Sequence, residues 1–138
     1  MIRSLSTSIL LVLGFFVAGI AIFYKWLITS DIPVSYTSAE AMTTHVMFTL
    51  STGLFLIASV VFNDRNGNLL LGVLFSFIFI ANIAIFKHHL GAEYYDHSFV
   101  QLQGSSILYS GIVMVFNFYL SARKFRLCTQ SSESVKSS

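Results

Sequence analysis

The sequence predicts an all-α integral membrane protein, a four-helix bundle with both termini in the cytoplasm. Of its 138 residues, 55% are apolar and only 10% are charged, and the mean hydropathy is +0.76. Soluble domains carry about 25% charged residues, so most of this surface cannot face water. In addition, apolar runs long enough to cross a bilayer recur four times along the chain.

Four segments meet the length that a membrane helix needs. The hydrocarbon core of a bilayer is about 30 Å thick, which a helix of about 20 apolar residues crosses. The predicted spans, which together form one bundle over residues 1–122, are residues 9–28, 42–62, 69–86 and 105–120. We expect the first to be a retained helix rather than a cleaved signal peptide, because its apolar run is long and no A-x-A site follows.

Polar segments separate these spans. The loop 29–41 contains Pro33, the only proline, and residues 63–68 read NDRNGN, which is a dense turn signal. A loop at 87–104 separates the third span from the fourth. Residues 123–138 are basic and then rich in serine, so we expect them to form a disordered cytoplasmic tail.

The lysines and arginines near the span ends predict the orientation, because cytoplasmic segments carry an excess of them. One side collects Arg3, Arg65 and the basic cluster at 123–126, whereas the other carries only Lys25 and Lys87. Loops 29–41 and 87–104 are therefore expected to face outward. Lys25 lies beside Trp26, and we interpret the pair as an interfacial anchor whose lysine reaches outward to the headgroups.

Small and polar residues at helical spacing predict which faces of the spans are buried. Helices in a bilayer associate through close packing of small residues and through interhelical hydrogen bonds. The predicted buried faces are Gly14, Ala18 and Gly19 in the first span, His45, Thr49, Thr52 and Ser59 in the second, Asn82 and His89 in the third, and Ser106, Ser110, Asn117 and Ser121 in the fourth. We expect Asn82 and Asn117 to lie at different depths and not to meet.

The predicted topology gathers all four histidines at the outer face. His45 is near the outer end of the second span, His88 and His89 close the third, and His97 follows in the loop. One interpretation is that these rings lie in the headgroup zone, as the neighbouring tyrosines do. A second is a zinc or copper site. His89, Glu93 and His97 are spaced by four, so a continuing helix would align them, and His45 would complete the ligand set.

A third interpretation is a b-type haem with His45 and His89 as axial ligands. Such a site needs two imidazoles at matched depth on facing helices, which the topology permits. Bulky Phe48 and Phe86 stand near these histidines, and they leave little room for the macrocycle.

Motifs for other chemistry are absent from the sequence. The chain has no G-x-S-x-G elbow, no phosphate-binding glycine loop and a single cysteine, Cys128. We therefore expect no catalytic residue and lean away from an enzyme. The net charge of +2 and the scattered basic residues predict no nucleic-acid partner.

Three stretches of the chain carry a family resemblance: AGIAIFYKW, LSTGLFLIASVVFNDRNGNLLLG and ANIAIFKHHLG. Over about residues 14–120 the layout resembles the small four-span bacterial membrane proteins of the DoxX-like type and related uncharacterised families. The resemblance implies a bacterial inner (plasma) membrane protein, in some cases the partner of a respiratory or redox enzyme. It carries over no catalytic residue.

The sequence thus favours a non-catalytic accessory subunit or interaction module. Its expected partners are the lipid bilayer and either other membrane subunits or further copies of itself. The alternative is a metal- or haem-binding redox component that uses the outer histidines.

Overall fold

A computed structural model describes residues 2–30, 36–62, 64–90 and 97–136. They form four helices: α1 (Ile2–Ile28), α2 (Ser38–Phe62), α3 (Arg65–Leu90) and α4 (His97–Lys136). Each helix contains a stretch long and apolar enough to cross a membrane, namely Thr7–Ile28, Ser38–Val61, Arg65–His88 and Val100–Arg126. The predicted all-α class and the number of membrane-length helices are confirmed.

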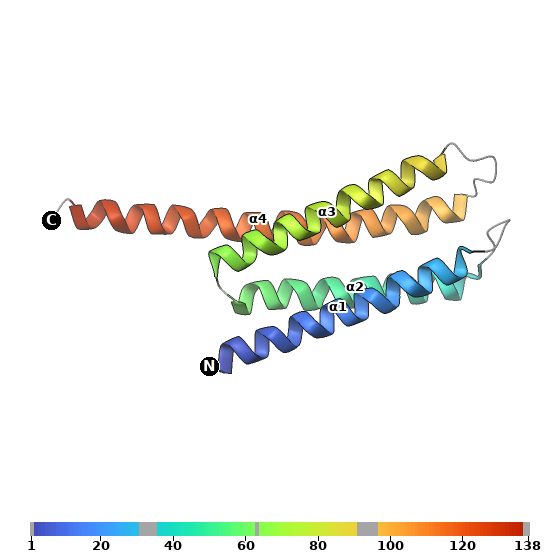
Figure 1. The fold of residues 1–138 in the computed structure, drawn as a ribbon, viewed down its shortest axis with the longest axis horizontal. Coiled ribbons are helices and arrows are strands. Elements are labelled where there is room, and N and C mark those ends of the chain that lie inside the picture. Colours follow the sequence, from blue (N-terminus) through green and yellow to red (C-terminus); the bar gives the residue numbers. More distant parts are fainter. Residues whose placement is uncertain (1, 31–35, 63, 91–96, 137–138) are drawn as a thin grey trace.

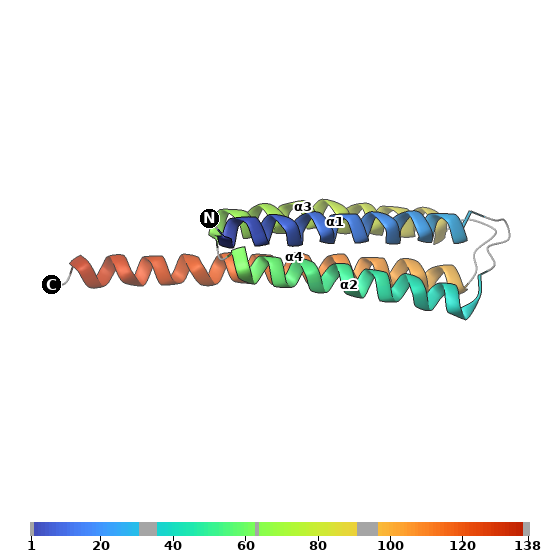
Figure 2. The ribbon, with the colours of Figure 1, turned by 90° about the horizontal axis from the view of Figure 1, so that it is seen from below.

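The helices form two antiparallel hairpins. α1 packs on α2 and α3 packs on α4, and contacts between α2 and α4 join the two hairpins. Seen from the side, α1 and α3 lie in one layer and α2 and α4 in the other (Figure 2). We call the loop end the end where α1 and α3 finish and α2 and α4 begin. The opposite end, where α2 passes into α3, is the turn end (Figure 1).

Local capping explains why α2 and α3 begin earlier than their predicted spans. Thr37 and Glu40 form a capping box: the Thr37 amide donates to Glu40 Oε2 at 2.7 Å, and the Glu40 amide donates to Thr37 Oγ1 at 3.3 Å. In the same way, Asp64 Oδ2 accepts a bond of 2.9 Å from the Gly67 amide at the start of α3. Side chains before the apolar runs therefore set these helix boundaries.

Where the sequence predicts a disordered tail over residues 123–138, the structure has α4 continuing as a helix through Lys136. Arginine, lysine, leucine, glutamine and glutamate are good helix formers, and no glycine or proline interrupts this segment. The far part of α4 extends well past the rest of the bundle (Figure 1).

Aromatic rings fill the core between the two layers. Phe55 of α2 lies 4.8 Å, centroid to centroid, from Phe15 of α1 and 4.8 Å from Phe75 of α3, in each case edge to face. Gly14 makes room for the Phe55 ring, since an added Cβ would lie 3.3 Å from it. The Gly14 carbonyl also accepts a bond of 3.1 Å from Ser51 Oγ. Small residues thus allow close approach of α1 and α2, as expected within lipid.

The predicted buried faces are confirmed in part. On α4 all four predicted polar residues are buried: Ser106, Ser110, Asn117 and Ser121. On α2 the buried polar residues are Thr44, Ser51 and Ser59, so the predicted face is confirmed at Ser59, only half-buried at His45 and Thr52, and wrong at Thr49, which is exposed. The physical reason is that Phe48 and Phe55 fix the core face of α2, and this turns Thr49 outward.

The two asparagines bond locally, in line with the expectation that they do not meet. Asn82 Nδ2 donates to the Ile78 carbonyl at 2.9 Å, and Asn117 Nδ2 donates to the Val113 carbonyl at 2.9 Å. On α1, Gly14 is buried as predicted, whereas Gly19 is exposed, with open space where a side chain would begin.

The packing of α3 on α4 yields a testable prediction at Gly72. A Cβ added there would lie 3.1 Å from the Phe118 ring, whereas one added at Gly53 would meet nothing within 4 Å. Gly72→Leu should therefore destabilise the protein by about 1–3 kcal/mol through overpacking. Gly53→Leu gains the same helix propensity without the clash. Unfolding in mixed micelles measures both, and equal effects would contradict this packing.

Candidate functional site

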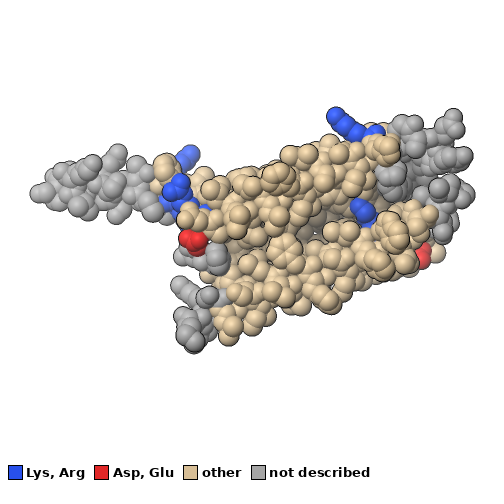
Figure 3. All heavy atoms as spheres, in the orientation of Figure 1, with Lys and Arg blue, Asp and Glu red and all other residues tan. Residues whose placement is uncertain are grey.

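A cavity of about 730 Å³ lies between the two layers, toward the loop end. All four helices line it: residues 15–26 of α1, together with Thr29 and Ser30 just after its end, and residues 48–55 of α2, 75–85 of α3 and 103–110 of α4. The space-filling view shows the molecular face hollowed between α1 and α3, in a surface that is almost free of charged atoms away from its ends (Figure 3). If the helices cross a bilayer, this opening faces the lipid.

The cavity changes character along its length. Its inner wall is the aromatic group of Phe15, Phe55 and Phe75, which meet edge to face. Its loop-end wall carries the polar groups Lys25, Thr29, Ser30, Asn82, Gln103 and Ser106. Phe15 and Lys25 lie nearly three turns apart on α1, which separates the apolar and polar ends by about 15 Å.

Lys25 is the charged group of this cavity. Its ammonium Nζ donates to Gln103 Oε1 at 2.6 Å and to Ser106 Oγ at 3.1 Å. The expectation that Lys25 reaches outward as a surface anchor was wrong, whereas the adjacent Trp26 is 62% exposed. The reason is the helical period: Lys25 shares its face with Ala18 and Ile22, which also line the cavity.

A directed chain of hydrogen bonds holds Gln103 in place. Its Nε2 donates to the backbone carbonyl of Asn82 at 3.1 Å and to Asn82 Oδ1 at 3.3 Å. Asn82 Nδ2 in turn donates to the Ile78 carbonyl. Because the amide NH₂ of Gln103 donates to Asn82 of α3, its amide oxygen is the atom that faces Lys25. Gln103 is 1% exposed, so these bonds hold it within the packed part of the bundle.

Lys25 has donor capacity left over. An ammonium group has three N–H donors, and the structure shows two of them in use. Both acceptors are neutral, and no Asp, Glu or His lines the cavity among the described residues. A cation removed from water is costly unless an anion accompanies it. This part of the cavity therefore favours a negatively charged group.

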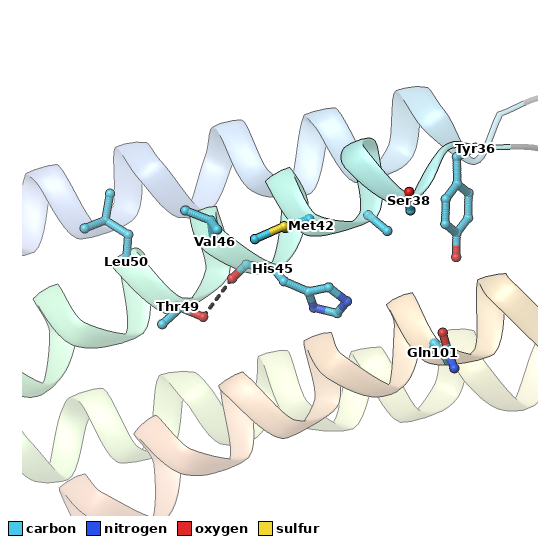
Figure 4. A pocket seen from close by; sticks show the side chains of 9 residues that line it. Tyr36, Ser38, Met42, His45, Val46, Thr49, Leu50 and Gln101 are labelled. Atoms are coloured by element: carbon cyan, nitrogen blue, oxygen red, sulfur yellow. Dashed lines mark hydrogen bonds between the residues drawn. The ribbon is translucent and has the colours of Figure 1, made fainter.

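His45 lines a different depression, a shallow groove of about 810 Å³ on α2 and α4. Its imidazole points from α2 toward α4, where Gln101 lies (Figure 4). Thr49 Oγ1 donates to the His45 carbonyl at 2.8 Å and lies 3.1 Å from the hydroxyl oxygen of Tyr109. The ring of Tyr109 stacks on Phe48, and both line the lysine cavity. These residues divide the groove from the cavity.

The structure describes the predicted histidine site only in part. His45, His88 and the backbone of His89 lie toward the loop end, as expected, but α2 and α3 diverge there (Figures 1 and 2). The side chains of His89 and His97, and the whole of Glu93, lie outside the described residues. Within the described part, no three His, Cys, Asp or Glu side chains come together to hold a metal. The zinc or copper site and the haem site stay predictions.

Comparison of the chain with protein-family models, with curated proteins and with solved structures finds no match in any of the three. The resemblance to the DoxX-like type therefore stays an expectation from the sequence.

Sequence reasoning missed the lysine cavity, although two signals for it were present. Lys25 interrupts the end of an apolar run, three residues after Ile22 and seven after Ala18, which places it on the same helical face. Gln103 lies just before the predicted fourth span and was assigned to a loop, whereas it is in α4 and fully packed. A lysine and a glutamine at matched depth on two membrane helices indicate an interhelical bond.

The bond between Lys25 and Gln103 predicts a measurable coupling. Gln103→Leu removes the acceptor of a charged hydrogen bond and should destabilise the protein by about 1.5–3 kcal/mol. In a Lys25→Met background the same substitution should cost less, because the charge is gone. Unfolding in mixed micelles measures the double-mutant cycle.

The matched control is Gln101→Leu, on the exposed face of the same helix, which should change stability by no more than about 0.5 kcal/mol. If Gln103→Leu costs as much without Lys25 as with it, the two side chains do not interact.

Proposed function

We propose that the protein is a non-catalytic accessory component of a membrane, and that its activity is to bind a single-chain amphiphile in the lysine cavity. The observation that carries this proposal is the gradient along the cavity, from the polar group around Lys25 to the aromatic wall at Phe55. An amphiphile has the same division between a polar head and an apolar chain.

The size and chemistry of the cavity support binding. Sites for small molecules commonly measure about 300–1,000 Å³ and combine an apolar lining with a few placed polar groups, and this one holds about 730 Å³. The hydroxyls of Ser51 and Ser110, which also line the cavity, donate to backbone carbonyls, so their protons are already used within the protein. Its open side between α1 and α3 would admit a molecule from within the lipid layer.

A binding role also fits the lysine better than catalysis. Proton transfer needs an acid or base within hydrogen-bond reach of the reacting group. The amine of Lys25 instead rests against an amide oxygen and a hydroxyl, and neither exchanges protons readily near neutral pH. The described lining thus supplies charge and hydrogen bonds but no general base beside the lysine.

Filling the cavity should abolish binding. Gly19 lines the cavity, and a Cβ built there meets nothing within 4 Å, so Gly19→Phe directs a ring into open space. We expect it to weaken the binding of radiolabelled hexadecanol and palmitate about tenfold or more, a change of about 1.4 kcal/mol per factor of ten.

Gly53→Phe is the matched control, because Gly53 has equally open space and does not line the cavity. It should leave the binding of both probes unchanged. Undiminished binding by Gly19→Phe would refute the proposed function.

For the orientation, we propose that the turn end lies in the cytoplasm and the loop end outside, in the inner membrane of a bacterium. The basic residues support this arrangement. Arg65 of α3 and the cluster Arg123, Lys124 and Arg126 of α4 belong to the turn end. At the loop end Lys87 is exposed, and Lys25 points into the cavity.

Thiol labelling tests this orientation. Cys128 follows the basic cluster, so a membrane-impermeant maleimide should leave it unlabelled in intact cells and modify it after permeabilisation. A cysteine introduced at exposed Ser30 provides the reverse control and should react in intact cells. Labelling of Cys128 before permeabilisation would invert the topology.

A further inference from the structure

We infer that the head of the bound amphiphile is a carboxylate, so that the ligand class is a long-chain carboxylic acid in its ionised form. The inference rests on the proposed function and names the chemistry of its ligand. The carboxylate would bind at Lys25, with the hydrocarbon chain running along the cavity toward Phe55.

Charge is the first argument for an anion. Lys25 is the only charged residue among the described residues that line the cavity. Its partners Gln103 and Ser106 are neutral, so an ammonium group at Lys25 has no compensating negative charge among the described residues that line the cavity. A ligand with a single negative charge neutralises the site, and ionic hydrogen bonds of this kind are stronger than neutral ones.

Hydrogen-bond direction is the second argument. Ser106 Oγ donates to the Leu102 carbonyl at 3.2 Å, and the hydroxyls of Thr29 and Ser30 donate to carbonyls of α1 at 2.8 Å each. The Gln103 amide donates to Asn82. The protons of these polar neighbours are already used in hydrogen bonds within the protein, whereas Lys25 retains a third N–H. The site therefore offers a donor to an acceptor-only group, which is what a carboxylate is.

The number of basic groups selects a carboxylate over a phosphate. Phosphate groups are typically held by arginine forks or by several donors together. No arginine lines the cavity in the described part of the chain, and Lys25 is its single cation. A small, singly charged head on one hydrocarbon chain matches this lining better than a phosphodiester with two chains.

The length of the cavity fits such a molecule. From Lys25 to Phe15, about 15 Å of α1 lines the space, and Ile22 and Ala18 lie between them on the same face. Ile78 and Ile85 of α3 line the opposite side. Burial of each methylene group contributes about 0.8 kcal/mol to the binding free energy. The hydrocarbon chain of the ligand therefore supplies affinity, while its head group supplies selectivity.

Binding of palmitate and of hexadecanol to the purified protein in nanodiscs of phosphatidylcholine tests the inference. The two probes share a chain and differ in the charge of the head. We expect the wild type to prefer palmitate by roughly tenfold or more. Lys25→Met, which keeps a long unbranched side chain, should bind the two probes about equally. Lys25→Arg should keep the preference.

Gln103→Glu provides a second variant if Lys25→Met folds poorly. It changes little in size and places a carboxylate beside Lys25, so the protein itself supplies the anion. The preference for palmitate should fall to about the level of Lys25→Met, while hexadecanol still binds. An unchanged preference in either folded variant would overturn the inference.

The outcomes separate this inference from the proposed function. If Gly19→Phe abolishes binding of both probes but the wild type does not distinguish them, the cavity binds amphiphiles and the carboxylate is refuted. If phosphatidylglycerol, tested in the same nanodiscs, displaces palmitate at lower concentration than unlabelled palmitate does, the head is a phosphodiester and the inference is again overturned. If Gly19→Phe binds both probes normally, the proposed function itself fails.

Discussion

The hydrogen bond from Lys25 to Gln103 connects the first helix to the last. α1 packs on α2, and α4 packs on α3 and α2, so the lysine makes a polar connection between helices that are not main packing partners. The 2.6 Å bond crosses the space between the hairpins at the loop end. Because Gln103 is in turn fixed by Asn82, one chain of hydrogen bonds links α1, α4 and α3.

At mid-bundle, aromatic packing replaces this polar connection. Phe55 meets rings from α1 and α3, and Gly14 admits it to the surface of α1. The hairpins are thus in contact through rings at one depth and through hydrogen bonds at another. The cavity is the space left between these two levels, and its apolar and polar ends follow directly from them.

The sequence was sufficient for the coarse fold and insufficient for the cavity. Hydropathy alone locates four membrane-length helices, because a bilayer imposes the same length on each. Hydropathy does not determine which face of a helix is turned toward the core. On α2, Phe48 and Thr49 are adjacent in the sequence, and only packing decides that Phe48 is buried and Thr49 exposed. The inward position of Lys25 was missed for the same reason, because hydropathy does not show toward which neighbour a helix face is turned. A lysine near a helix end fits a surface anchor equally well until a partner such as Gln103 is placed opposite.

The length of α4 has a mechanical consequence. Gln103 and Lys136 belong to one uninterrupted helix, and about 50 Å of axis separates them at 1.5 Å per residue. A helix of this length that moves as one body converts a small tilt at one end into a displacement of several ångströms at the other. A tilt of α4 as one body about Gln103 would therefore displace Lys136 far more than it displaces the residues beside Lys25.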